Sequence, residues 1–240
     1  MTELNNKTIG EIVAEDYRTA QIFKDHGIDF CCKGNRSIRE ACEPRNMDPE
    51  RVIGEIEALW RQTPEEAFDF QAWALDRLAD HIEKKHHRYV EEKIPVLNAY
   101  LSKLCSVHGS RHPELFEIAR EFKSCGGELA AHMKKEELVL FPFIRKMAKT
   151  QPGEGVGQPY FGTVQNPIQM MMDEHNTEGD RFRKISGLSN GYNPPEDACG
   201  TYRVTYALLQ EFEEDLHLHI HLENNILFPK SLSLEKQLRG

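Results

Sequence analysis

Two blocks of the chain carry histidine and glutamate at the same spacing. Residues 132–142 read HMKKEELVLFP and residues 219–229 read HIHLENNILFP, so both contain H-x-x-x-E followed by L-F-P in one register. An i, i+4 pair lies on one face of a helix, and here that face is otherwise apolar. Because a buried carboxylate is costly unless it is paired or bound to a metal, the pairs His132–Glu136 and His219–Glu223 are candidate metal ligands.

Two other helices each add one inward-facing histidine. His87 lies on an apolar stripe with Val90, Ile94, Leu97, Leu101 and Leu104, and His175 lies on one with Ile168, Met171, Phe182 and Ile185. The neighbouring His86 falls off its stripe. Four imidazoles and two carboxylates suit a pair of first-row metal ions, with nitrogen ligands on each ion and carboxylates free to bridge. A single inward histidine is more often a hydrogen-bonded core residue, but four interrupted stripes in a duplicated pattern favour a metal site.

The other histidines and two nearby carboxylates are weaker candidates. His81 and His217 are predicted to lie on solvated faces, the latter with Glu213, Glu214 and His221, and His108 and His112 flank a loop. Neither the paired E-x-x-H of ferritin-like sites nor the H-E-x-x-H of zinc proteases is present. Glu128 and Glu174 adjoin the predicted ligands. Each could orient a ligand, carry protons or hold iron in transit, and the alternative is that both are ordinary surface carboxylates.

Adjacent thiols, Cys31 and Cys32, form a second candidate site. They follow a His26-Gly27 turn and precede Lys33-Gly34, which predicts an exposed setting whose cations favour thiolate. Two soft thiolates could accept iron or pass it on, whereas the alternative is packing as small apolar side chains. The remaining cysteines, at 42, 105, 125 and 199, are predicted to be structural. No CxxC pair is present, and in a reducing cytosol all six are expected to be free thiols.

An all-α fold is needed to position these groups. Turn-rich segments at 43–48 and 62–66, with Thr63-Pro64, delimit a small helical domain at residues 1–63. Its helix starts are marked by capping boxes at Thr8–Glu11 and Ser37–Glu40 and by Asp48-Pro49. Residues 70–240 are predicted to form an antiparallel four-helix bundle. Its period-3.6 helices span about 71–105, 113–149, 166–188 and 197–232, with a Gly- and Pro-rich loop after the second.

Composition excludes several classes of protein. The 240 residues carry a formal net charge of −9, a sign that disfavours binding to nucleic acid or to an anionic membrane. The longest apolar run, residues 138–144, is much shorter than the roughly 20 residues that a spanning helix needs. The N-terminus lacks a basic start and an apolar segment, so no secretory signal is expected. These features predict a cytoplasmic protein that does not bind membranes.

Together the motifs resemble a known family. DFCCKG at 29–34, DHI at 80–82, HMKKE at 132–136 and HIHLENNILFP at 219–229 resemble the iron–sulfur cluster repair di-iron proteins, whose bundle is hemerythrin-like. The resemblance implies two iron ions per chain with an oxo or hydroxo bridge, held by His87, His132, Glu136, His175, His219 and Glu223. It also implies that Glu136 and Glu223 bridge the ions, and that the protein is a homodimer.

The family resemblance implies a role in repairing iron–sulfur clusters damaged by oxidative or nitrosative stress, with iron donated to apo or damaged iron–sulfur proteins. The first alternative is an enzyme, a di-iron nitric oxide reductase. The second is a hemerythrin-type carrier or sensor of oxygen, which the Cys-Cys domain disfavours because a carrier does not need a thiol pair. Nitric oxide or oxygen would be the small ligand in these alternatives.

Overall fold

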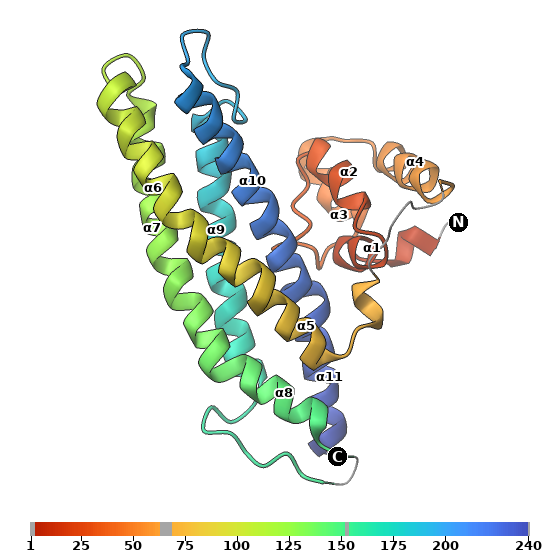
Figure 1. The fold of residues 1–240 in the computed structure, drawn as a ribbon. Helices are drawn as coiled ribbons and strands as arrows, with labels where there is room; N and C mark the ends of the chain where they lie inside the picture. Colours follow the sequence, from red (N-terminus) through yellow and green to blue (C-terminus); the bar gives the residue numbers. More distant parts are fainter. Residues whose placement is uncertain (1–2, 63–68, 152–153, 240) are drawn as a thin grey trace.

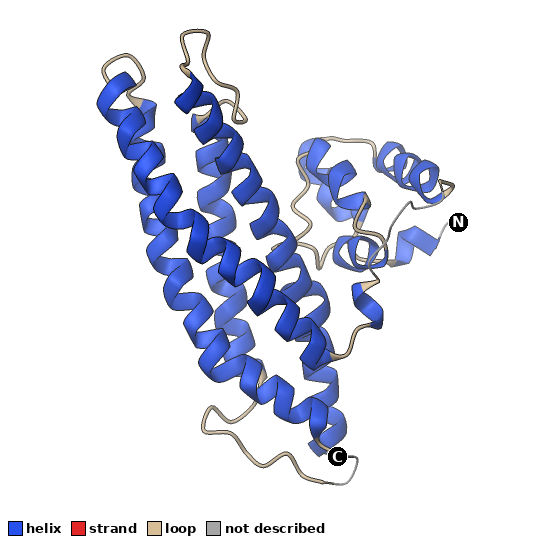
Figure 2. Ribbon diagram, in the orientation of Figure 1, coloured by secondary structure: helices blue, strands red, loops and turns tan. Residues whose placement is uncertain are grey.

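The computed structural model describes residues 3–62, 69–151 and 154–239, and these residues form helices and no extended strand (Figure 2). A small helical domain lies beside a long bundle (Figure 1). The prediction of an all-α protein with these two parts is therefore confirmed. The predicted boundary at Thr63-Pro64 lies outside the described residues.

Short helices build the small domain, and their starts are the predicted ones. Thr8 and Ser37 each accept a hydrogen bond from the backbone N–H three residues on, with the reciprocal glutamate contact in place. Asp48 caps the helix that begins at Pro49. The α-helices are α1 (Ile9–Glu15), α2 (Thr19–Asp25), α3 (Ile38–Cys42) and α4 (Pro49–Trp60), and the 3-10 turns are η1 (Glu3–Asn6) and η2 (Glu43–Arg45).

The bundle is built from four long antiparallel helices, most of them interrupted once. Bundle helix 1 comprises α5 (Leu75–His81), η4 (Ile82–His87) and α6 (Arg88–His108), and bundle helix 2 comprises α7 (Glu114–Lys135), η5 (Glu136–Leu140) and α8 (Phe141–Lys149). Bundle helix 3 is α9 (Gln165–Leu188). Bundle helix 4 comprises α10 (Gly200–Leu222), η6 (Glu223–Leu227) and α11 (Phe228–Arg239). The first begins later than predicted because Phe70–Ala72 form a separate 3-10 turn, η3, capped by Asp69. The fourth continues beyond the predicted residue 232.

The interruptions η4, η5 and η6 are π-turns, which the sequence analysis did not predict. Each contains a candidate metal ligand at one end: His87 ends η4, Glu136 begins η5 and Glu223 begins η6. In the last two, Pro142 and Pro229 supply a cause, because proline has no N–H and its ring clashes with the carbonyl four residues earlier. The backbone N–H groups of Phe141 and Phe228, which precede these prolines, donate to the backbone carbonyl oxygens of Glu136 and Glu223, five residues back. Such turns are frequent at functional sites.

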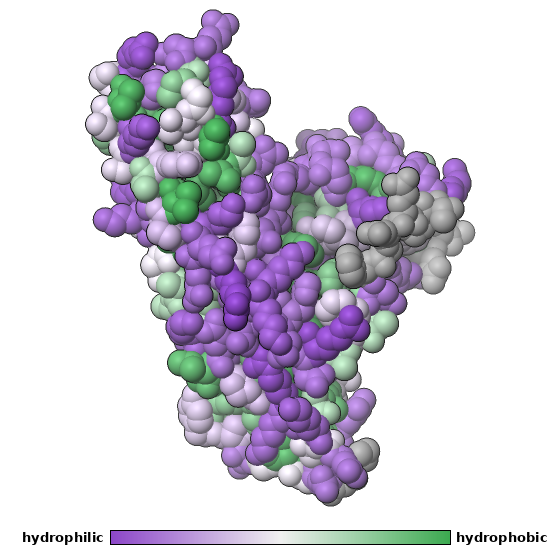
Figure 3. Space-filling view, in the orientation of Figure 1, coloured by the Kyte–Doolittle hydropathy of each residue, from purple (hydrophilic) through white to green (hydrophobic). Residues whose placement is uncertain are grey.

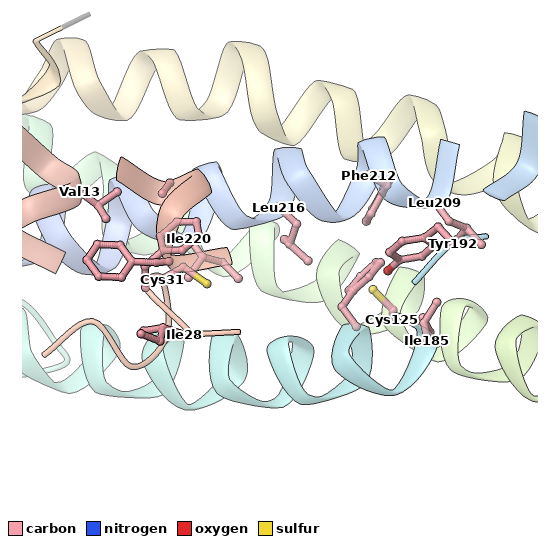
Figure 4. Close-up of a cluster of buried hydrophobic side chains, with 14 of the residues drawn as sticks. Val13, Ile28, Cys31, Cys125, Ile185, Tyr192, Leu209, Phe212, Leu216 and Ile220 are labelled. Carbon is pink, nitrogen blue, oxygen red and sulfur yellow. The ribbon is translucent and has the colours of Figure 1, made fainter. Parts of the chain in front are cut away.

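The small domain packs against bundle helix 4, and the two parts share one apolar core. Buried side chains from Leu4 to Ile56 form a continuous cluster with others from Val90 to Ile220. Figure 4 shows Val13, Ile28 and Cys31 beside Ile220. This contact corrects the prediction of a solvated face on α10: Glu213 and His221 are buried and His217 is half-buried, because the small domain covers them.

Hydrophilic side chains cover most of the face seen in Figure 3. Apolar side chains gather toward the end of the bundle where α6 meets α7 (Figure 3), and Val107 and Phe116 there are more than half exposed. Among the described helices, none has a stretch long and apolar enough to cross a membrane.

Candidate metal centre

The six predicted ligands come together in the interior of the bundle. They form two overlapping groups, one of His87, Glu136, His219 and Glu223 and the other of His132, Glu136, His175 and Glu223, all buried. Glu136 Oε2 lies 3.4 Å from Nε2 of both His87 and His132. Glu223 lies 3.1 Å from Nε2 of both His175 and His219. Each glutamate therefore lies against one histidine of each group, so the two groups form two half-sites that share both carboxylates.

Unpaired polar atoms at the centre test whether a metal pair fits. Both oxygens of Glu136, one oxygen of Glu223 and Nε2 of His87 are buried without a hydrogen-bond partner. Leaving such groups unpaired costs about 1–3 kcal/mol each. Imidazole nitrogens and carboxylate oxygens are ligands for first-row metal ions, so cations would satisfy these atoms. The donor set fits a pair of iron ions.

The outer nitrogens of three of these histidines are held by acceptors. Nδ1 of His87 lies 3.0 Å from Glu137, Nδ1 of His132 lies 2.7 Å from Glu174, and Nδ1 of His175 lies 2.9 Å from Asn224 Oδ1. An acceptor at Nδ1 places the ring proton there and leaves the Nε2 lone pair facing the centre, as in many metal sites. Nδ1 of His219 is buried and has no partner among the described residues.

Glu137 and Asn224 were missed by the sequence analysis, although a signal for them exists. Each directly follows a predicted bridging glutamate, so they occupy the same place in the two repeated blocks. In both blocks this place supplies an acceptor for a histidine of a different helix. Comparing the blocks position by position would have identified both.

Charge at the centre is balanced by protons when no cation is present. Burial lowers the pKa of His132, but Glu136, Glu174 and Glu223 outweigh this and raise it to about 10. Burial and Glu223 oppose ionisation of Glu136, but His132 and His87 outweigh them and lower its pKa. Nε2 of His132 lies 3.1 Å from Nε2 of His175, so a proton or a metal ion is needed between them.

The placement of His86 is a correction. It was predicted to fall off the buried stripe, but it is fully buried, its Nδ1 lies 3.0 Å from Asp215, and its ring stacks on that of His219. The wider π-turn η4 lets the adjacent His86 and His87 both face the interior. The expectation for His81 is also revised, since this residue is half-buried against Trp73 and Phe70.

The two carboxylates beside the ligands differ. Glu174 contacts the ligand candidate His132 and also pairs with Lys135, so it can orient that ring. Glu128 contacts no ligand candidate; it pairs with Arg181 at 2.8 Å and is more than half exposed. Both line a cavity of about 160 Å³ that reaches His132 and His175. The cavity therefore lies directly beside the His132–His175 half-site.

The segment that carries Cys31 and Cys32 between α2 and α3, called the cysteine loop here, is less exposed than predicted. Cys31 is buried, and its hydrogen bond to Cys32, its burial and the Asp29 carboxylate raise the pKa of the Cys31 thiol well above its usual value. The expected cationic setting is wrong for Cys31, because Arg183 pairs with Asp29 and the Lys33 side chain is exposed. Cys32 is half-buried, and its Sγ donates to the backbone carbonyl of His175 at 3.3 Å. The loop therefore lies directly against one ligand candidate.

Comparison with known proteins agrees with this arrangement. Residues 5–60 match the ScdA_N family, described as a domain of unknown function, and residues 78–231 match the hemerythrin HHE cation binding domain. The chain is 32% identical over 228 residues to the iron-sulfur cluster repair protein ScdA of Staphylococcus haemolyticus, covering 94% of this chain and 98% of that protein. It is 33% identical over 230 residues to the iron-sulfur cluster repair protein YtfE of Yersinia pestis, covering 96% and 98%. A hemerythrin HHE bundle joined to an ScdA_N domain, with relatives matched over nearly their whole length, places this chain in the family of the iron–sulfur cluster repair proteins ScdA and YtfE.

Proposed function

We propose that the chain binds two iron ions and donates iron to apo or damaged iron–sulfur proteins after oxidative or nitrosative stress. One observation carries the proposal: two buried groups of side chains share Glu136 and Glu223, and both oxygens of Glu136 and one of Glu223 are buried without a hydrogen-bond partner. The half-site of His87 and His219 would hold one ion and that of His132 and His175 the other. An oxo or hydroxo group would complete the bridge.

Donation of iron is supported by the access that the second half-site has to its surroundings. His132 and His175 line a cavity beside this half-site, and Cys32 lies against the His175 backbone. The relatives ScdA and YtfE are named as iron–sulfur cluster repair proteins. We propose that Cys31 and Cys32 receive iron as it leaves, since a bound metal ion favours deprotonation of a thiol whose own pKa is high.

Anaerobic transfer of iron to an apo iron–sulfur enzyme tests the proposal. The iron-loaded chain should restore the enzyme's activity, in the absence of free iron, with a yield set by the iron bound. His175→Ala should abolish transfer by lowering iron content, whereas the control His112→Ala, at a histidine paired with Asp197 far from the centre, should leave it unchanged. Cys31→Ser combined with Cys32→Ser should keep both ions and slow transfer. A chain that takes up no iron, or that restores activity no faster than its released iron does, would refute donation.

Nitric oxide reduction is the second candidate, and the cavity beside His132 and His175 is the observation that favours it. Its volume of about 160 Å³ admits small molecules. Two ferrous ions would supply the two electrons that, with two protons, convert two nitric oxide molecules to nitrous oxide and water. Formation of nitrous oxide by the reduced protein in single turnover, measured by gas chromatography, separates this activity from donation. Oxygen carriage or sensing has less support, because it gives no role to the Cys-Cys domain.

We also propose a cytoplasmic location and a homodimer. All six cysteines are free thiols, as expected in a reducing compartment. Light scattering on the iron-loaded protein tests the dimer, and fractionation of cells tests the location.

A further inference from the structure

Asn224 connects the cysteine loop to a candidate metal ligand. Its Nδ2 donates to the carbonyl oxygen of Cys31 at 3.1 Å, and its Oδ1 lies 2.9 Å from Nδ1 of His175. Both contacts are buried. A carbonyl oxygen can only accept, so the Cys31 contact fixes which end of the amide faces it. Oδ1 must then accept the Nδ1 proton of His175, and Nε2 of that ring presents its lone pair to the centre.

The neighbouring Asn225 holds the same loop in place. Its Nδ2 donates to the carbonyl oxygen of Phe30 at 3.2 Å. Its Oδ1 lies in a slot formed by two glycines of the small domain: a Cβ added at Gly10 would come within 2.3 Å of Oδ1, and one added at Gly34 within 3.0 Å. The slot is therefore too narrow for any side chain at Gly10 while Asn225 occupies it.

Both asparagines belong to the π-turn η6, which begins with Glu223. The small domain is thus hydrogen-bonded to the turn that supplies one bridging carboxylate, and through Asn224 to a histidine of another helix. The other outer contacts do not depend on the small domain, because Glu137 and Glu174, which hold His87 and His132, belong to the bundle. Among the described residues, only the outer contact of His175 continues into the small domain.

We infer that Asn224 and Asn225 form a latch through which docking of the small domain positions His175 and retains the metal ion of the His132–His175 half-site. Breaking the latch frees the Asn224 amide to turn its Nδ2 toward His175. The ring proton then moves to Nε2, where it competes with the metal ion. The ion of the His87–His219 half-site loses no contact of its own. This inference rests on the proposed two-metal site and adds to it a control over which ion leaves.

Two kinds of variant separate the halves of the latch. Asn224→Ala removes both the donor to the Cys31 carbonyl and the acceptor for Nδ1 of His175. Gly10→Ala keeps the Asn224 and His175 side chains themselves. The added methyl group pushes Asn225 out of its slot and so loosens the docking that holds the Cys31 carbonyl against Asn224. Asn176→Ala is the matched control, because Asn176 adjoins His175 but bonds only to Met172 of its own helix.

Release of metal from the full chain measures the effect. The protein is loaded with two equivalents of cobalt(II), mixed with excess EDTA, and followed by the visible absorption of the bound ion. Outer-contact changes of this kind alter metal affinity by about 10–100-fold. We expect Gly10→Ala to speed release of one ion by at least about tenfold, with the other changed less than about threefold and the helical circular dichroism retained. Asn224→Ala should act in the same direction, and Asn176→Ala should release both ions at the wild-type rates.

The outcomes distinguish the latch from the metal site itself. If folded Gly10→Ala and Asn224→Ala release both ions at wild-type rates, or speed both equally, the latch is refuted while the two-metal site stands. If the wild-type chain takes up fewer than two cobalt ions, the two-metal proposal fails instead. Should Gly10→Ala not fold, Asn225→Ala, which removes a side chain rather than adding one, tests the same contact.

Discussion

Replacing Glu174 by glutamine should weaken binding of one metal ion without removing any ligand. The Glu174 carboxylate lies 2.7 Å from Nδ1 of His132. A hydrogen bond to a charged acceptor is worth about 1.5–3 kcal/mol and a neutral one about 0.5–1.5 kcal/mol. The difference is about 1–1.5 kcal/mol, and because the Glu174 side chain is 35% exposed we take the lower part of that range. At 1.4 kcal/mol for each factor of ten, the affinity of the His132–His175 half-site should fall by about five- to sevenfold.

Competition with a chromophoric chelator measures this affinity, and Glu128→Gln provides the control. Glu128 lines the same cavity and carries the same charge, but its partner is Arg181 rather than a ligand candidate. The control should change the affinity by less than about twofold, since an exposed ion pair contributes little. Equal losses in the two variants would mean that general negative charge in the cavity, and not the contact with His132, supports the ion. No loss in either would refute the role assigned to Glu174.

Three further predictions follow from the site and its surroundings. His87→Ala should remove about one metal ion per chain, whereas His86→Ala should keep both ions and only lower their affinity. Metal analysis of the two variants checks this, and equal ion loss would make His86 a ligand. Metal loading at pH 7 should release about one proton per chain, because the raised pKa of His132 leaves this side chain protonated before metal binds. Calorimetry in buffers of different ionisation enthalpy measures the number of protons released. Metal binding without proton release would contradict the assignment of His132 as a ligand. Burial raises the pKa of Glu213 to about 7, so the free energy of unfolding falls as the pH rises from about 4.5 to 7 and this buried carboxyl ionises. Glu213→Gln should therefore stabilise the protein by about 1–3 kcal/mol at pH 8 and by little at pH 5, as measured by urea unfolding.

The bundle and the six ligand candidates could be predicted because helical periodicity is a property of the sequence itself. Each predicted ligand interrupts an apolar stripe, and all six are buried together. Helix starts in the small domain were equally accessible, because a capping box is a local arrangement that Thr8–Glu11 and Ser37–Glu40 spell out.

What the sequence analysis missed depends on contacts between distant segments or on changes of helical pitch. His86 was misplaced because the prediction assumed the pitch of a regular α-helix, whereas the π-turn η4 shifts the helical phase so that His86 and His87 are both buried. Glu213 and His221 read as a polar face of α10, and only the docked small domain makes that face an interior. The Cys31 loop likewise rests on a distant segment: the Cys31 carbonyl accepts a hydrogen bond from Asn224 of η6, almost two hundred positions away along the chain.

The shared apolar core has a consequence for how the protein unfolds. Side chains of the small domain complete the packing of bundle residues such as Ile220 (Figure 4), so loss of the small domain would expose part of the bundle's own interior to water. Two regions that match separate sequence families would therefore melt as one cooperative unit, with a single calorimetric transition rather than two. The unit that unfolds cooperatively would thus span both regions that the sequence families separate. A bundle expressed without residues 5–60 would carry an apolar, aggregation-prone face.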